Sequence, residues 1–141
     1  VVGPLLAEAP FSTEHSWLFD FGPSSQVPGS GWNHVSTELG ATPGGILNGV
    51  VNAGGQAAPL TLEIVAPFNA ANLDGSQSSA VFPAAATRDS LYGNTSEFNG
   101  NSNVFPSIRL NGLDPALDLQ GHGTAQAGSG VDAHGLHVRT A

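Results

Sequence analysis

The sequence contains no cysteine, no methionine and no lysine, and its three arginines stand against eleven acidic residues. Without cysteine, a disulfide framework, a thiolate-bound zinc ion and a cysteine nucleophile are all excluded. The net charge of −8 repels phosphate backbones and anionic lipid, which argues against nucleic acid and membrane as partners. Long apolar runs are also missing, and none approaches the length of a membrane-spanning helix.

What the chain has instead is glycine and proline, 19 and 10 residues, which together make up about a fifth of its 141 residues. This proportion is typical of short strands joined by tight turns, and the length is that of a single domain. Hydrophobic residues make up 40%, enough for a folded core, whereas charged residues make up only 10%. Neutral hydroxyl and amide side chains must therefore solvate the surface, and such a surface suits hydroxyl-rich partners such as glycans.

Strand-like alternation of apolar and polar residues is strongest in four segments. They are residues 16–22, 60–68, 106–113 and 135–140, and weaker candidates cover residues 32–36, 45–51 and 79–84. Turn-forming sequences such as NAGGQ and YGNTS separate them, and one short helical turn is predicted near residues 87–93. The spacing predicts an all-β protein, an antiparallel β-sandwich. Its predicted core contains Trp17, Phe19, Phe21, Leu62, Ile64, Ile108 and Leu110.

Three regions are predicted along the chain. Residues 1–14 are predicted to be a leader or linker, residues 15–118 the β-sandwich module, and residues 119–141 an atypical tail rich in Gly, Ala and His. The start at Val1 rather than at methionine predicts a mature or excised piece of a secreted protein. In the tail only residues 135–140 predict a closing strand, so the sandwich is expected to be incomplete at this end. An incomplete sandwich leaves a strand edge exposed, which predicts a homo-oligomer whose contact includes residues 131–140.

Two stretches of the sequence resemble known modules. FDFGPSSQVPGSGWNHVS, residues 19–36, resembles the start of the galactose-binding-like jelly-roll modules of secreted bacterial polysaccharide-active enzymes, including rhamnogalacturonan acetylesterase-like hydrolases. ATRDSLYGN and IRLNGLDPAL, residues 86–94 and 108–117, resemble a pattern of secreted bacterial proteins that carry a C-terminal sorting signal. The resemblance covers residues 16–118 and implies carbohydrate binding outside the cell or at its surface. After GLDP the chain departs from it, because a Tyr-rich apolar strand pair is expected where ALDLQGHGTAQAGSG stands.

A sugar-binding site is predicted from aromatic and neutral polar side chains near the strand ends. A sugar ring packs its C–H face on an aromatic side chain, while its hydroxyls need amide, carboxylate or imidazole groups. Trp32 can supply this surface or pack in the core, and strand alternation places Asn33 on the face opposite Trp32 and His34. The predicted sugar-binding residues are Trp32, Asn33, His34, Asp89, Tyr92 and Asn94.

Two sets of residues are candidates for metal binding. Asp20 lies between two inward-facing aromatic residues, so its side chain is predicted on the opposite face, either solvated or as a ligand for calcium or a sugar hydroxyl. In the tail, Asp132, His134 and His137, with His122 as a fourth residue, are candidate ligands that no single strand or helix brings together. Carbohydrate binding requires no cofactor, and a structural calcium ion is the candidate metal.

The predicted function is that of a carbohydrate-binding accessory module of a secreted, bacterial, glycan-active protein. One alternative is a small hydrolase that acts on glycosides or esters through surface carboxylates or histidines. No catalytic residue is assigned, because a Gly-x-Ser-x-Gly elbow is missing and the sequence sets no distance between its carboxylates. The second alternative is a structural β module that assembles through its strand edges.

Overall fold

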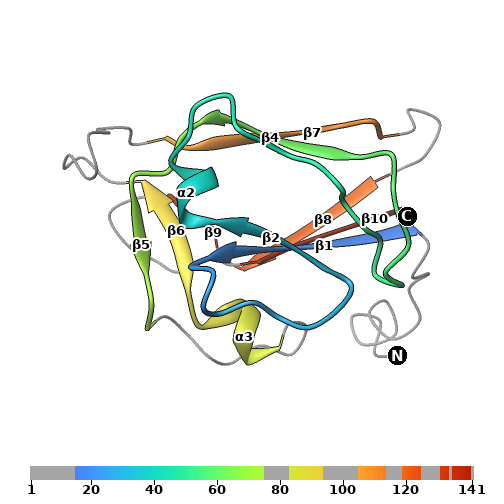
Figure 1. Ribbon diagram of the computed structural model, residues 1–141, viewed down its shortest axis with the longest axis horizontal. Helices are drawn as coiled ribbons and strands as arrows, with labels where there is room; N and C mark the ends of the chain where they lie inside the picture. Colours follow the sequence, from blue (N-terminus) through green and yellow to red (C-terminus); the bar gives the residue numbers. More distant parts are fainter. Residues whose placement is uncertain are drawn as a thin grey trace, which may run out of the picture.

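The computed structural model describes residues 15–74, 83–93 and 105–113, together with the backbone of strands 119–124, 131–133 and 135–140 (Figure 1). These residues form ten strands in three sheets, with only two helices of four residues each. The predicted all-β class is therefore confirmed. Neither helix in these ranges has the length and hydropathy that a membrane span requires.

Sheet A has four strands in the order β2-β1-β10-β8. The strand β1 (Ser16–Gly22) is antiparallel to β10 (Gly135–Thr140), which is antiparallel to β8 (Leu119–Thr124). By contrast, β1 and β2 (Trp32–Ser36) run parallel, although the sequence predicted antiparallel neighbours. The reason is the connection: the segment between them carries the chain back along β1 before β2 begins, as a parallel pair requires. Gly31, with φ of 83°, is the last residue before β2. A Cβ there would overlap the Ala53 carbonyl, so both the backbone conformation and the close approach favour glycine at this position.

The other two sheets have three antiparallel strands each. Sheet B has the order β3 (Ile46–Leu47), β4 (Thr61–Ala66) and β7 (Ser107–Asn111), with an irregularity of register between Ile64 and Ala66. Sheet C has the order β5 (Ala70–Asn72), β6 (Ser90–Gly93) and β9 (Val131–Ala133).

The two short helices follow local sequence signals. Helix α2 (Thr37–Gly40) follows β2 directly, and its first turn is capped by Ser36, whose hydroxyl accepts a hydrogen bond from the Leu39 N–H at 3.2 Å. Helix α3 (Ala84–Thr87) begins after Pro83, in part of the segment predicted as a strand over residues 79–84; residues 79–82 lie outside the described residues. The short helical turn predicted near residues 87–93 is present as α3, but it lies a few residues earlier, and Ser90–Gly93 form β6 instead.

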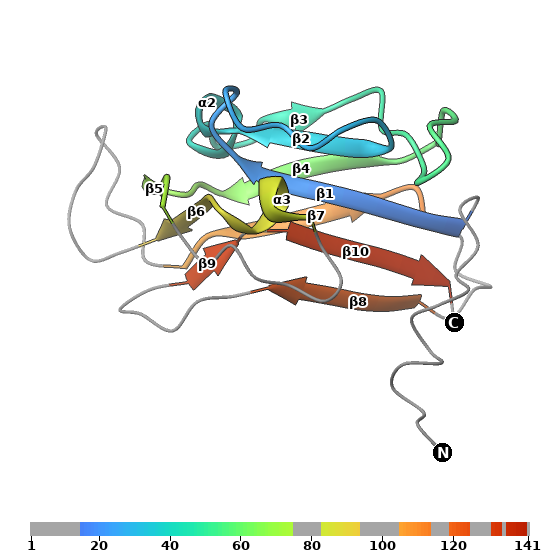
Figure 2. The same cartoon turned by 90° about the horizontal axis from the view of Figure 1, so that it is seen from below.

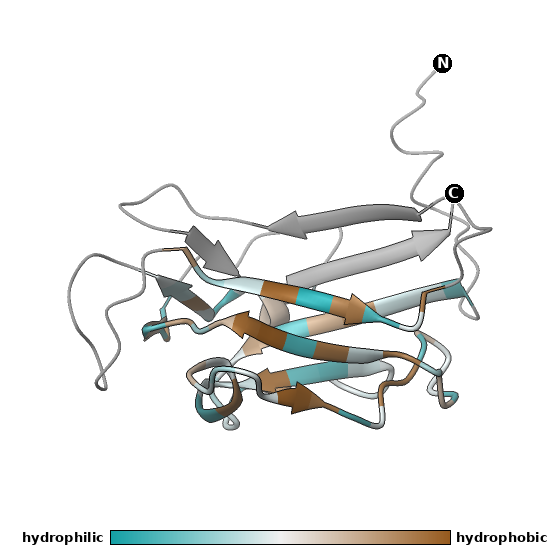
Figure 3. Ribbon diagram, turned by 90° about the horizontal axis from the view of Figure 1, so that it is seen from above, coloured by the Kyte–Doolittle hydropathy of each residue, from teal (hydrophilic) through white to brown (hydrophobic). Residues whose placement is uncertain are grey.

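The main core lies between sheets A and B, and it contains the residues that alternation predicted. Phe19, Leu62 and Ile64 are completely buried, and Ile108 and Leu110 pack against this cluster from β7. The alternation along β4 and β7 is visible in Figure 3, where hydrophobic and hydrophilic positions follow one another. The predicted core is confirmed, because one apolar face per strand is enough to define it. Its buried members are Trp17, Phe19, Phe21, Val35, Val50, Leu60, Leu62, Ile64, Phe68 and Leu91.

The second face of β1 is covered as well. Figures 1 and 2 show α3 on the side of sheet A that faces away from β4 and β7, with β6 running from α3 past the end of β1. β1 and β6 are in contact, although they belong to different sheets. Asp20 and Gly22, which alternate with the core aromatics of β1, are therefore buried as well.

The tail contains more strand than the sequence predicted. β8, β9 and β10 occupy residues 119–140, where one closing strand was expected. β10 lies between β1 and β8, so the GLHVRT segment has a neighbour on both sides and is not a sheet edge. Of these strands, β10 pairs with β1, β8 with β10 and β9 with β6, and only β10 has a strong alternating pattern of its own. The predicted leader over residues 1–14 lies outside the described residues.

Candidate functional site

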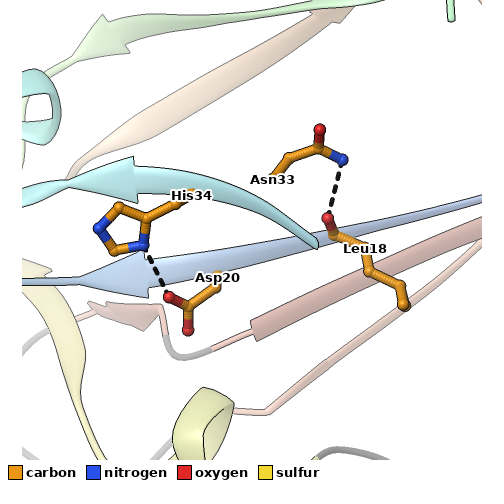
Figure 4. Close-up of polar contacts among 4 residues, drawn as sticks. All are labelled: Leu18, Asp20, Asn33 and His34. Atoms are coloured by element: carbon orange, nitrogen blue, oxygen red, sulfur yellow. Dashed lines mark hydrogen bonds and ion pairs between the residues drawn. The ribbon is translucent and has the colours of Figure 1, made fainter. Parts of the chain in front are cut away.

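Asp20 is on the face of β1 opposite the aromatic residues, as alternation predicted, but it is not solvated. Its side chain has 0% relative exposure. The parallel register places Asp20 beside His34 of β2, and Asp20 Oδ2 lies 2.8 Å from His34 Nδ1 (Figure 4). The ion pair therefore follows from the β1–β2 pairing, which the sequence did not predict.

His34 is held in one orientation by this contact. An ionised Asp20 only accepts hydrogen bonds, so Nδ1 of His34 carries the hydrogen and donates it. The His34 side chain is 16% exposed, and its Nε2 atom is enclosed with no hydrogen-bond partner among the described residues. The ring is thus fixed at one edge by a buried carboxylate.

Asp89 is the second buried carboxylate, and it comes from the junction of α3 and β6. It has 0% exposure, and neither of its carboxylate oxygens has a hydrogen-bond partner within the described part of the chain. Its carboxylate lies on Gly22 of β1, where a Cβ would overlap it. A glycine within a strand is a signal of such close approach, and Gly22 was the sequence feature that could have located Asp89 here.

Burial controls the charge of this Asp20–His34–Asp89 cluster. The pKa of Asp89 is raised to about 6, mainly because burial disfavours the ionised form and further because Asp20 is negative. The backbone N–H of Asp89 itself, His34 and Arg88 lower this pKa, but they do not cancel the effect of burial. Burial also raises the pKa of Asp20, in spite of the hydrogen bond and the charge of His34. The cluster therefore favours one protonated carboxyl group in mildly acidic solution.

The structure places the predicted metal ligands of the tail only by their strands, because their side chains lie outside the described residues. The described residues contain no group of three or more His, Cys, Asp or Glu side chains that could hold a metal ion. Asp132 is on β9, opposite Tyr92 of sheet C, whereas His137 is on β10 in sheet A, opposite Leu18 and His122. His134 lies outside the described residues.

Asn33, a predicted sugar-binding residue, is instead part of the fold. Its Nδ2 atom donates to the carbonyl oxygens of Leu18, at 2.9 Å (Figure 4), and of Val51, at 2.8 Å. Its Oδ1 atom accepts the Val51 N–H at 2.8 Å. Both amide hydrogens are used and the side chain is 6% exposed, so Asn33 is removed from the proposed sugar site.

The remaining predicted residues lie in different parts of this region. Trp32 is partly buried at the start of β2, on the same face as His34, and pairs in register with Leu18. Tyr92 is partly buried on β6, three residues after Asp89. Asn94 lies outside the described residues. The structure thus brings His34 and Asp89 together with Asp20, and it places Trp32 next to them along β2.

Comparisons of the chain with models of known protein families, with curated proteins and with solved structures find no match. The functional proposal therefore depends on two features of the molecule. They are the face of β2 that carries Trp32 and His34, and the enclosed Asp20–His34–Asp89 cluster beside it.

Proposed function

We propose that this chain is a carbohydrate-binding accessory module of a secreted or surface-attached, glycan-active bacterial protein, with a galactose-binding-like jelly-roll fold. The observation that carries the proposal is the face of β2, where Trp32 and His34 are neighbours on one side of the strand and both are partly exposed. An indole ring offers a stacking surface for a sugar ring, and the His34 ring, held in one orientation by Asp20, adds ring surface beside it.

The segment before β2 supports the same site. From Phe21 to Asn33 the sequence contains no charged residue, and Ser24, Ser25 and Ser30 are exposed. Their hydroxyls can exchange hydrogen bonds with sugar hydroxyls without the desolvation of a charge. The proposed site therefore consists of residues 23–31 with Trp32 and His34, and it requires no cofactor.

The test is a glycan-array screen followed by calorimetric titration of the best oligosaccharide. Trp32→Ala should weaken binding about tenfold, because the stacking surface is lost. Phe105→Ala is the matched control, since Phe105 is an aromatic residue with 73% exposure that is not part of the proposed site. Equal affinities for the unaltered chain and Trp32→Ala would contradict the proposed site.

A second candidate function, glycoside or ester hydrolysis, is favoured by one observation. The Asp20–His34 pair at 2.8 Å and the pKa of Asp89, about 6, are properties that general acid–base groups need. Against it, both carboxylates have 0% exposure. Incubating the chain with the same glycans and with chromogenic esters separates the two functions. Product release that is lost in His34→Gln would support hydrolysis, and binding without product release would support the accessory module.

A further inference from the structure

The Asp20–His34–Asp89 cluster joins two parts of the fold. Asp20 and His34 belong to β1 and β2 of sheet A, whereas Asp89 lies in residues 83–93, the α3–β6 segment. Figure 2 shows α3 lying over β1 and β6 at the end of β1, and Asp89 is one of the two residues between α3 and β6. Its carboxylate on Gly22 is therefore a contact that holds the α3–β6 segment against sheet A.

The number of hydrogen-bond donors at this contact depends on one proton. Three enclosed carboxylate oxygens, Oδ1 of Asp20 and both oxygens of Asp89, have no hydrogen-bond partner among the described residues. Two ionised carboxylates only accept hydrogen bonds, and side by side in a buried site they repel each other. A protonated Asp89 supplies one O–H donor and removes the repulsion.

We propose that this cluster is a pH-sensitive switch, in which protonated Asp89 holds the α3–β6 segment against β1 and ionisation of Asp89 releases that segment. The switch does not depend on the proposed carbohydrate binding. It follows from two buried carboxylates, the contact of the Asp89 carboxylate with Gly22, and three carboxylate oxygens that have no hydrogen-bond partner among the described residues.

The charged groups around Asp89 set the direction of the switch. Asp20 faces it from β1 and favours the protonated form, while His34 on β2 and the neighbouring Arg88 favour the ionised form. Glu38 of α2 is exposed, and its pKa is lowered by its own backbone N–H, by Ser36 and, to a smaller extent, by His34. On β6, Tyr92 is the titratable residue, and it pairs in register with Asp132 of β9. Burial and Asp20 prevail, so the pKa of Asp89 is about 6 in the folded chain.

The sign of the pH dependence follows from proton linkage. The closed state binds the proton more tightly than the open state, because the pKa of Asp89 is about 6 when closed and near the ordinary 3.8 when open. The contact is strongest below about pH 4 and weakens as the pH rises through about 6. Between pH 5 and pH 7.5 the ratio of open to closed segment should rise about tenfold.

Amide hydrogen exchange of the intact chain tests this directly. After correction for intrinsic rates, the opening of β6 at Leu91 and Tyr92 should increase about tenfold from pH 5 to pH 7.5. Amides of Leu62 and Ile64 in β4 serve as an internal reference, and their opening should not change with pH over this range. Asp89→Asn, whose amide group can donate as the protonated carboxyl does, should abolish the dependence. Asp74→Asn, at an exposed carboxylate, should retain it.

A second measurement tests the proposed switch even if the Asp89→Asn variant does not fold. Carboxyl-carbon resonances of the unaltered chain should show Asp89 titrating near pH 6, together with the opening of β6. The proposal is overturned if Asp89 titrates at the ordinary value of a free aspartate. It is also overturned if Asp89 titrates near pH 6 while the exchange of β6 does not change, or if Asp89→Asn keeps the pH dependence of the unaltered chain.

Discussion

At the scale of single residues, burial decides which polar side chains bind ligands and which hold the fold together. Trp32, Asn33 and His34 are adjacent in sequence and chemically suited to a sugar, but they alternate between two faces of β2. Asn33 faces the interior and joins β2 to Val51 and Leu18 through three hydrogen bonds. Its amide group satisfies backbone groups that would otherwise be buried without partners.

The contribution of the Asn33 amide to stability can be measured by removing it. Asn33→Ala should lower the free energy of unfolding by about 2–4 kcal/mol, because it leaves buried backbone groups of Leu18 and Val51 without partners. Urea unfolding followed by circular dichroism measures the change. Asn111→Ala, at an exposed position of β7, is the matched control and should change stability by less than about 0.5 kcal/mol. Equal stabilities of the two variants would show that the Asn33 bonds contribute nothing.

At the scale of secondary structure elements, β1 has two buried faces with different roles. One carries the aromatic residues of the core, and the other carries Asp20 and ends at Gly22. The absence of a side chain at Gly22 allows α3 and β6 to approach β1 through Asp89. A glycine that looks like a strand end in the sequence is therefore a packing site.

Replacing Gly22 tests this packing. Gly22→Ala places a methyl group where the Asp89 carboxylate lies, so it should destabilise the chain by about 1–3 kcal/mol. The cost should be smaller in a chain that already carries Asp89→Ala, and the difference between the two measures the contact. Gly29→Ala is the control, because a Cβ there meets no atom within 4 Å. Additive effects of Gly22→Ala and Asp89→Ala would argue against the contact.

At the scale of the whole molecule, the sheet order relocates the predicted site of self-association. β10 is an inner strand, so among the described residues the outer strands of sheet A are β2 and β8. An unpaired strand edge offers backbone donors and acceptors to a second copy. We therefore keep the proposal of a homo-oligomer but place its contact at one of these edges.

Because the chain is strongly negative, its self-association should depend on the salt concentration. The net charge of −8 opposes association, and raising the salt from about 0.1 M to 1 M shortens the screening length from about 10 Å to about 3 Å. Light scattering at about 100 μM chain should therefore give a mass above that of the monomer, and the mass should increase with salt. A monomer at both salt concentrations would rule out association through these edges.

The sequence alone determined the strands with strong alternation and the core that they form. In β1, β4 and β7, apolar residues at every second position place Phe19, Ile64 and Ile108 on one face whatever the neighbouring strand is. The same alternation placed Asp20 on the opposite face. This information is local, because the period of a strand depends only on its own backbone.

Only the tertiary structure decided what lies on that opposite face. Alternation separates two faces of a strand but does not say whether a second layer covers the outer one, and α3 and β6 do cover it at β1. The pairing of His34 with Asp20 required the parallel register, and the position of Asp89 on Gly22 required a contact between residues far apart in sequence. β8 and β9 formed without a strong apolar pattern of their own. Burial of a charge and pairing of a strand are set by what a distant segment places next to them, and no local pattern contains that information.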